Sequence, residues 1–146
     1  MNELLKLFNT LVIYDYNIRV LHWKVVGLDF GTKHELMDDY HSQLNSMIDD
    51  IGECILMLHG SIPSLVDIID NAKNDTDESY TMLTGTETYD ARKVIELARK
   101  MFTQLISIYQ TATTNDSLPG DIVNVLQEHQ YWLRKETRYK LDSTLS

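Results

Sequence analysis

Four long stretches of the chain repeat apolar residues every three or four positions, and neither of its two prolines interrupts them. This spacing places the apolar side chains on one face of an α-helix. Proline breaks helix interiors, so its position outside them, together with a content of only six glycines, favours long continuous helices. The four stretches are residues 3–26, 32–59, 88–113 and 119–141. They predict an all-α fold in one domain, residues 1–146.

Glycines and capping residues indicate where these helices begin and end. Gly27 and Gly60 follow the first two stretches and are expected to stop them. Thr32 with Glu35 three residues later forms a candidate capping box for the second helix. The last five residues, 142–146, are expected to fray.

The second and third helices are joined by a long connection, residues 61–87. Within it, residues 64–72 indicate a short helix capped by Ser64, and the polar stretch around Gly85 indicates a loop. The other two links are short. Four helices with a single long crossover describe a ferritin-like four-helix bundle.

The periodic positions are the candidate core. In the first helix they are Leu4, Leu5, Phe8, Leu11, Val12, Tyr16, Arg19, Val20 and Trp23. In the last helix they are Ile122, Val123, Leu126, His129, Tyr131, Trp132 and Leu133.

Composition excludes several classes of protein. The single cysteine, Cys54, cannot form an internal disulfide and fits a reducing compartment, so we expect a cytoplasmic protein. No run of eighteen apolar residues is present, so no membrane span is expected. The net charge of −9, with Lys6 the only basic residue among the first eighteen, predicts no DNA binding.

A stripe of histidines and carboxylates is the candidate site. His34, Asp38, Asp49 and Glu53 form two i,i+4 pairs, and their spacing along a helix places all four on roughly one face. Eleven residues separate Asp38 from Asp49, about 16 Å along the axis at ~1.5 Å per residue. No metal with ligand bonds near 2 Å can contact both pairs within one chain. A metal site here therefore needs a second chain, and an antiparallel copy would bring His34 and Asp38 against the partner's acidic pair.

The donor chemistry restricts the metal. Imidazole and carboxylate ligands without thiolate suit iron, manganese or zinc. Alternatives remain for each group, because a histidine and a carboxylate on a helix can be solvated, and His22 beside Trp23 can be a structural core histidine. A cation between Asp49 and Glu53 would offset the repulsion of like charges at that spacing.

At these residues the sequence resembles the Dps family, the miniferritins. The pattern is His22-Trp23, then His34-x-x-x-Asp38, then Asp49-x-x-x-Glu53, with spacings of 12, 4, 11 and 4. The resemblance extends over about residues 3–141. It implies a hollow homo-oligomer, usually a dodecamer, with ferroxidase sites at two-fold interfaces.

In such a site, the resemblance implies that His22, His34 and Asp38 come from one subunit and Asp49 and Glu53 from its partner. These five residues are the predicted metal ligands and catalytic residues. Fe(II), in a mono-iron or di-iron site, would be oxidised by H₂O₂ or O₂ and stored as ferric iron, protecting against oxidative damage. Zinc or manganese would also fit the donors in vitro.

Some residues depart from the family pattern or admit a second interpretation. Gly52-Glu53-Cys54 stands where relatives usually have Ala-Glu-Arg, and Cys54 is expected to be a buried filler rather than a redox switch. Trp23 is either an interface aromatic or a donor of electrons to stray oxidants. His41 and His59 are expected to be solvated. An acidic run could line an ion pore or simply face solvent, and comprises Asp67, Asp70, Asp75, Asp77 and Glu78.

Two other functions stay open from the sequence. A structural or assembly protein of the same fold could have lost useful oxidase activity. A different carboxylate-bridged enzyme is the third class, although such enzymes usually carry Glu-x-x-His pairs, which this chain lacks.

Overall fold

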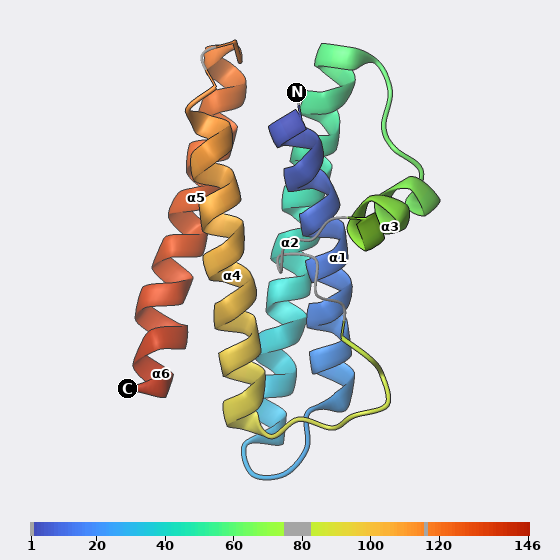
Figure 1. Ribbon diagram of the computed structural model, residues 1–146. Helices are drawn as coiled ribbons and strands as arrows, with labels where there is room; N and C mark the ends of the chain where they lie inside the picture. The colour runs from blue at the N-terminus through green and yellow to red at the C-terminus, as the bar shows by residue number, and fades with distance from the viewer. Residues whose placement is uncertain (1, 75–82, 116) are drawn as a thin grey trace.

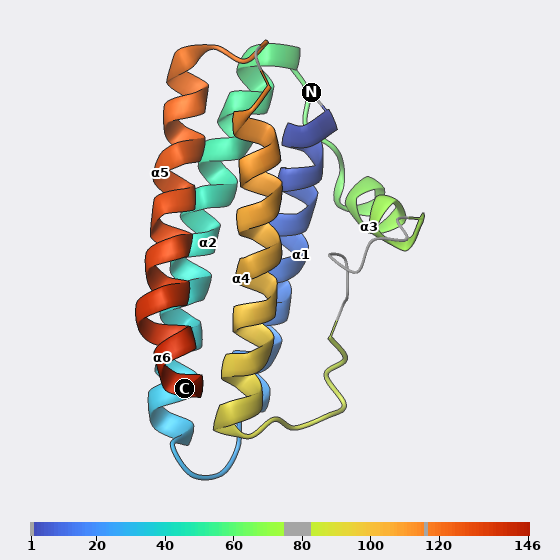
Figure 2. The ribbon, with the colours of Figure 1, turned by 60° about the vertical axis from the view of Figure 1, so that its left-hand side comes forward.

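Two helical hairpins, joined by a long crossover, build the bundle. The computed structural model describes residues 2–74, 83–115 and 117–146. The long helices are α1 (Asn2–Lys24), α2 (Phe30–His59), α4 (Ala91–Thr113) and α5 (Gly120–Glu136). They lie side by side, with the link between α1 and α2 at one end of the bundle and the link between α4 and α5 at the other (Figure 1). The short helix α3 (Leu65–Asn74) lies beside α1, outside the four (Figure 2). The ferritin-like architecture and the short helix in the crossover are thus confirmed.

The end of the crossover is fastened to the end of α1 by backbone hydrogen bonds. The Val26 amide donates to the Tyr89 carbonyl at 2.9 Å, and the Tyr89 amide donates to the Lys24 carbonyl at 3.0 Å. Asp90 then caps α4, because its carboxylate accepts from the Lys93 amide at 2.8 Å. This fixes α4 next to the α1–α2 link, where the candidate site lies.

The core is built from one apolar stripe on each long helix. Within it the rings of Tyr40 and Phe102 meet the half-buried Trp132 ring, with centroids 4.8–5.8 Å apart, in tilted and edge-to-face pairs that aromatic quadrupoles favour. None of the described helices is long and apolar enough to cross a membrane.

The prediction of which face of the first helix is buried is partly wrong. Tyr16 and Trp23 are exposed, at 55% and 53%, whereas the inner face of α1 uses side chains that the prediction left out. These are Leu7, Tyr14, Ile18 and Leu21. The helix is apolar on more than one side, so helical spacing alone selects two faces. In α5, Tyr131 is likewise exposed at 69%.

The expected start of the second helix is also wrong. α2 begins at Phe30, so Thr32 lies within its first turn rather than at a capping box. Asp29 precedes the helix at φ 64°, without a side-chain cap. The Phe30 ring stacks on His34 with centroids 5.0 Å apart, so the new first residue of the helix contacts the residue four positions further along.

Other helix ends agree with the sequence. Gly60 adopts φ 73° and its amide donates to the Leu56 carbonyl at 2.8 Å, which is an αL cap. Ser64 Oγ accepts from the Asp67 amide at 3.2 Å, as expected of a helix cap.

The expected fraying of residues 142–146 is wrong. α5 continues into a π-helical turn, η2 (Thr137–Asp142), and then α6 (Ser143–Leu145). Leu141 is fully buried and Asp142 pairs with Arg99 of α4, so this last segment is held against the bundle.

Candidate metal centre

The predicted ligands lie at the end of α1 and along one continuous helix. His22 is near the last turn of α1, and the other four predicted ligands are within α2. Because α2 is unbroken from Phe30 to His59, Asp38 and Asp49 are about 16 Å apart along its axis. The three carboxylates are exposed, and both histidines are half-buried.

The structure brings His22 and His34 together. Their rings stack with centroids 3.7 Å apart and an interplanar angle of 19°. Each Nδ1 lies 2.7 Å from the backbone carbonyl oxygen of the other residue, so the two hydrogen bonds are reciprocal. Phe30 covers the far side of the His34 ring. Two residues twelve apart in sequence thus share one fixed arrangement across the α1–α2 link.

These two hydrogen bonds determine which ring nitrogens of His22 and His34 are available to bind a metal ion. A carbonyl oxygen can only accept, so each Nδ1 must carry a hydrogen. In a neutral imidazole the other nitrogen, Nε2, then keeps its lone pair. Metal-binding histidines use this same division, with one nitrogen anchored to a carbonyl and the other free to ligate. The His22–His34 pair therefore has the chemistry of two metal donors. The His34 ring also donates a hydrogen bond to the His22 carbonyl, which lies at the end of α1.

The described part of one chain does not assemble a complete ligand set. Within residues 2–74, 83–115 and 117–146, no three His, Cys, Asp or Glu side chains lie close enough together to hold a metal ion. Asp49 and Glu53 lie along α2, away from the histidine pair. The acidic run is divided too: Asp67 and Asp70 are exposed on α3, while Asp75, Asp77 and Glu78 lie outside the described residues.

Exposed apolar side chains lie close in sequence to the histidine pair. Trp23 stacks edge-on against Tyr16, with centroids 6.3 Å apart, and the Arg19 guanidinium lies 4.9 Å from the Trp23 ring. Val26, Leu28 and Phe30 add exposed apolar surface at the adjoining link, with Leu28 at 89%. Several exposed large apolar side chains near one another in the chain are typical of an interaction site.

Two histidines outside the predicted set were expected to be solvated. His41 is not, since its Nδ1 donates to Asp15 at 2.6 Å between α2 and α1. Burial raises the pKa of the Asp15 carboxyl, and the bond to His41 partly offsets this. His59, in contrast, is exposed as expected.

His129 is buried at the centre of a three-residue network. Its Nε2 lies 2.8 Å from the Asp50 carboxylate, and its Nδ1 lies 2.7 Å from the Tyr109 hydroxyl. Because the carboxylate only accepts, Nε2 carries the hydrogen and Nδ1 accepts from Tyr109. The network joins α2, α4 and α5. A histidine at a periodic, core-facing position of the last helix was the only sequence signal of it.

Cys54 adjoins Glu53 but faces the interior. The side chain is buried, and burial raises the pKa of its thiol above the ordinary 9.0. Both observations agree with the expected role as an apolar filler, because the thiolate is the reactive form.

Comparison with known proteins places this chain in a family. The ferritin-like domain model matches residues 1–139. The DNA protection during starvation protein of Listeria monocytogenes is 28% identical over 114 residues, covering 76% of this chain and 71% of that protein. The antigen TpF1 of Treponema pallidum superposes with a TM-score of 0.85 at 18% identity, covering 99% of this chain and 89% of that one.

A third similar structure is the Dps protein of Vibrio cholerae O1, described as a member of a broad superfamily of ferritin-like diiron-carboxylate proteins. It superposes with a TM-score of 0.79 at 20% identity, covering 99% of this chain and 87% of that one. The chain belongs to the ferritin-like family. Its relatives by sequence include a DNA protection during starvation protein, and the structures that share its fold include Dps proteins.

Proposed function

We propose that this protein oxidises Fe(II) with H₂O₂ or O₂ at sites shared between two subunits and stores the ferric product within a shell. The observation that carries the proposal is the His22–His34 pair, anchored through both Nδ1 atoms at one end of a carboxylate stripe. Membership of the ferritin-like family, and similarity to a diiron-carboxylate Dps protein, support iron as the substrate.

Each residue has a distinct task in this proposal. Nε2 of His22 and of His34 would bind Fe(II), and the reciprocal bonds would hold both rings in place before iron arrives. The Asp38, Asp49 and Glu53 carboxylates would bind iron and balance the charge that rises on oxidation. With peroxide, two Fe(II) supply two electrons, the O–O bond breaks, and two protons complete two waters.

A second subunit completes the site. The separation of about 16 Å between Asp38 and Asp49 exceeds what one or two irons with ligand bonds near 2 Å can bridge. A two-fold partner would place its Asp49 and Glu53 against the histidines, and the exposed Trp23, Val26 and Leu28 would be covered in that contact. A two-fold contact repeats every interaction twice, so each pair of subunits would carry two sites. We propose a dodecameric shell, as in Dps proteins.

The first test compares variants of the stripe with a matched histidine control. His34→Ala and Asp38→Ala should each abolish rapid Fe(II) oxidation, followed by ferric absorbance after anaerobic loading and addition of H₂O₂ or O₂. His59→Ala removes an exposed histidine of the same helix and should leave the rate unchanged. Native mass must stay that of the assembled protein in all three. An unchanged rate in both stripe variants would reject the assignment.

Mixed assemblies test whether the site is shared. One subunit type carries His34→Ala with Asp38→Ala, and the other carries Asp49→Ala with Glu53→Ala. Each type alone should be inactive. In random co-assembly from an equal mixture, about half of the two-fold pairs contain unlike subunits. Each unlike pair has one intact site of its two, so about one quarter of all sites should be active. If the ligands all came from one chain, the mixture would stay inactive.

Two further expectations accompany the proposal. The acidic charge of −9 predicts no shift of duplex DNA in a gel at low salt. An assembled shell that neither binds nor oxidises iron would instead support a structural protein of the same fold.

A further inference from the structure

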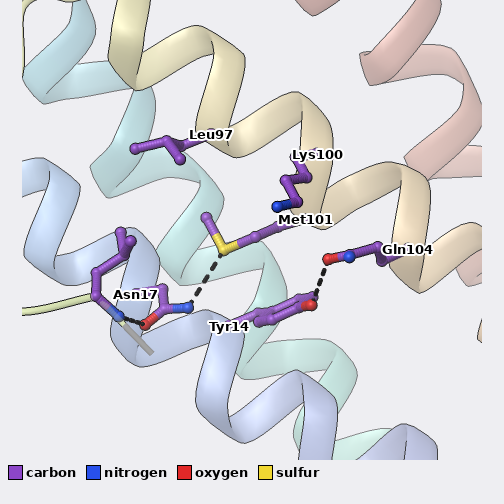
Figure 3. A pocket seen from close by; sticks show the side chains of 7 residues that line it. Tyr14, Asn17, Leu97, Lys100, Met101 and Gln104 are labelled. Carbon is purple, nitrogen blue, oxygen red and sulfur yellow. Dashed lines mark hydrogen bonds between the residues drawn. The ribbon is translucent and has the colours of Figure 1, made fainter. Parts of the chain in front are cut away.

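A small cavity between α1 and α4 is lined by residues that range from the exposed Lys100 to the buried Met101. It has a volume of about 30 Å³ and a mostly apolar wall. Its rim is the exposed Lys100 with the half-buried Leu83, Leu97 and Gln104, and its buried wall is Tyr14, Asn17 and Met101. A cavity needs about 10–15 Å³ to hold one water molecule, so this cavity can admit a molecule as small as hydrogen peroxide. Figure 3 shows Met101 reaching from α4 toward Asn17 on α1.

We propose that Met101 is a site of oxidation by hydrogen peroxide, giving methionine sulfoxide. A lone pair of Sδ attacks one peroxide oxygen, the S–O bond forms and the O–O bond breaks. The sulfur loses two electrons, and the second oxygen leaves as water with both protons. One peroxide is thereby reduced without a metal. The proposal is independent of the iron chemistry above.

The surroundings of the sulfur suit the product. The Asn17 amide nitrogen lies 3.6 Å from Met101 Sδ and donates to it, although a thioether is a weak acceptor. A sulfoxide oxygen is a stronger acceptor, and the Asn17 N–H group is already in place for it. The same Asn17 is held by a second bond, since its Oδ1 accepts from the Leu83 amide at 3.0 Å. The added oxygen therefore meets a positioned donor and an adjoining empty volume.

Other methionines of the described chain provide internal references. Met57 is 73% exposed, Met101 is 6% exposed beside the cavity, and Met37 and Met47 are fully buried. A fully buried core sulfur waits for an opening of the fold, which costs up to the full free energy of unfolding. Access through the cavity would give Met101 a rate between those two limits.

The test exposes the assembled protein to millimolar H₂O₂ with a chelator present, so that no iron takes part. Samples are quenched with catalase and digested, and each methionine is measured by mass spectrometry. Met57 should oxidise first, and Met101 at least about tenfold faster than Met37 and Met47. A Met101 rate as low as that of Met37 and Met47 would overturn the proposal.

Two substitutions at Leu97 test the cavity as the route. Leu97→Phe fills it and should slow oxidation of Met101 severalfold, while Leu97→Ala widens it and should speed the reaction. The Met57 rate should be the same in both variants. Low rates at Met37 and Met47 verify that each variant is folded. If neither substitution changes the Met101 rate in folded protein, the cavity does not supply the peroxide and the proposal is rejected.

Discussion

Gly52 offers a quantitative test of how closely α1 and α2 pack. It is buried within the C-terminal half of α2 and lies in sequence between the predicted ligands Asp49 and Glu53. A Cβ added there would lie 3.4 Å from Phe8 Cε2 and 3.6 Å from Ile62 Cδ1, which are ordinary van der Waals contacts. Gly52→Ala should therefore fit without displacing the backbone.

The expected gain has two parts. Alanine is favoured over glycine in a helix interior by about 0.8–1.0 kcal/mol. Burying one extra methyl group adds up to roughly 0.8 kcal/mol. The sum, about 1–2 kcal/mol, should raise the urea midpoint by about 0.5–1 M at an m-value near 2 kcal/mol/M. The protomer concentration must be equal in both samples, because assembly also stabilises the fold.

Substitutions at Gly60 and Gly31 separate the effects of backbone conformation and helix propensity from the effect of methyl burial. Gly60 has φ 73° and caps α2, so Gly60→Ala should lower stability by about 1–2 kcal/mol. Gly31 lies in the first turn of α2, and a Cβ added there would meet nothing within 4 Å, so Gly31→Ala can gain only from helix propensity. A Gly52→Ala protein less stable than the parent would refute the packing argument, and would mean that the Phe8 ring cannot accept the methyl group.

Three further predictions concern buried polar groups. Cys54 should react with iodoacetamide at pH 8 at least about tenfold more slowly in the folded protein than in urea, because burial raises the pKa of its thiol. The pKa of Asp15 is raised in the folded chain above its ordinary value of 3.8, so the folded chain binds this proton more tightly than the unfolded chain does. The contribution of Asp15 to the free energy of unfolding therefore falls as pH rises from 3.8 through the folded pKa. Asp15→Asn should remove that slope in urea unfolding measured from acidic to neutral pH, and an unchanged slope would contradict the assignment. Tyr109→Phe leaves the buried His129 nitrogen without its donor and should cost about 1–3 kcal/mol in the same assay, whereas Tyr131→Phe, at an exposed position, should stay within about 0.5 kcal/mol of the parent.

Hydrophobic periodicity predicted the bundle well because the long helices are stabilised mainly by packing one apolar face. The range 3–26 became Asn2–Lys24, and 88–113 became Ala91–Thr113. Periodicity failed where a helix has apolar residues on two sides. In α1, Tyr16 and Trp23 fit the helical spacing as well as Ile18 and Leu21 do, and only the position of α2 and α4 decides which pair is buried.

Helix ends depended on contacts that the capping and fraying rules do not take into account. Thr32 and Glu35 satisfy the capping pattern, yet α2 starts at Phe30, whose ring packs on His34. At the other end of the chain, Leu141 buries itself in the bundle through a π-helical turn, and this long-range contact keeps residues 143–145 helical. The start of α2 thus departs from the capping pattern beside a contact within the same helix, whereas tertiary packing holds the end that was expected to fray.

The candidate site divides into a part that helix geometry dictates and a part that it cannot. The rise of an unbroken helix is enough to separate Asp38 from Asp49 by about 16 Å, so the proposed metal site would need a second chain once α2 is continuous. The reciprocal bonding of His22 and His34 depends instead on how the link between α1 and α2 returns the chain. Since both Nδ1 atoms are held by carbonyls, neither ring can turn its Nε2 away without losing a hydrogen bond. The histidines are therefore oriented before any metal binds, and the mixed-assembly experiment asks whether the partner's carboxylates meet them.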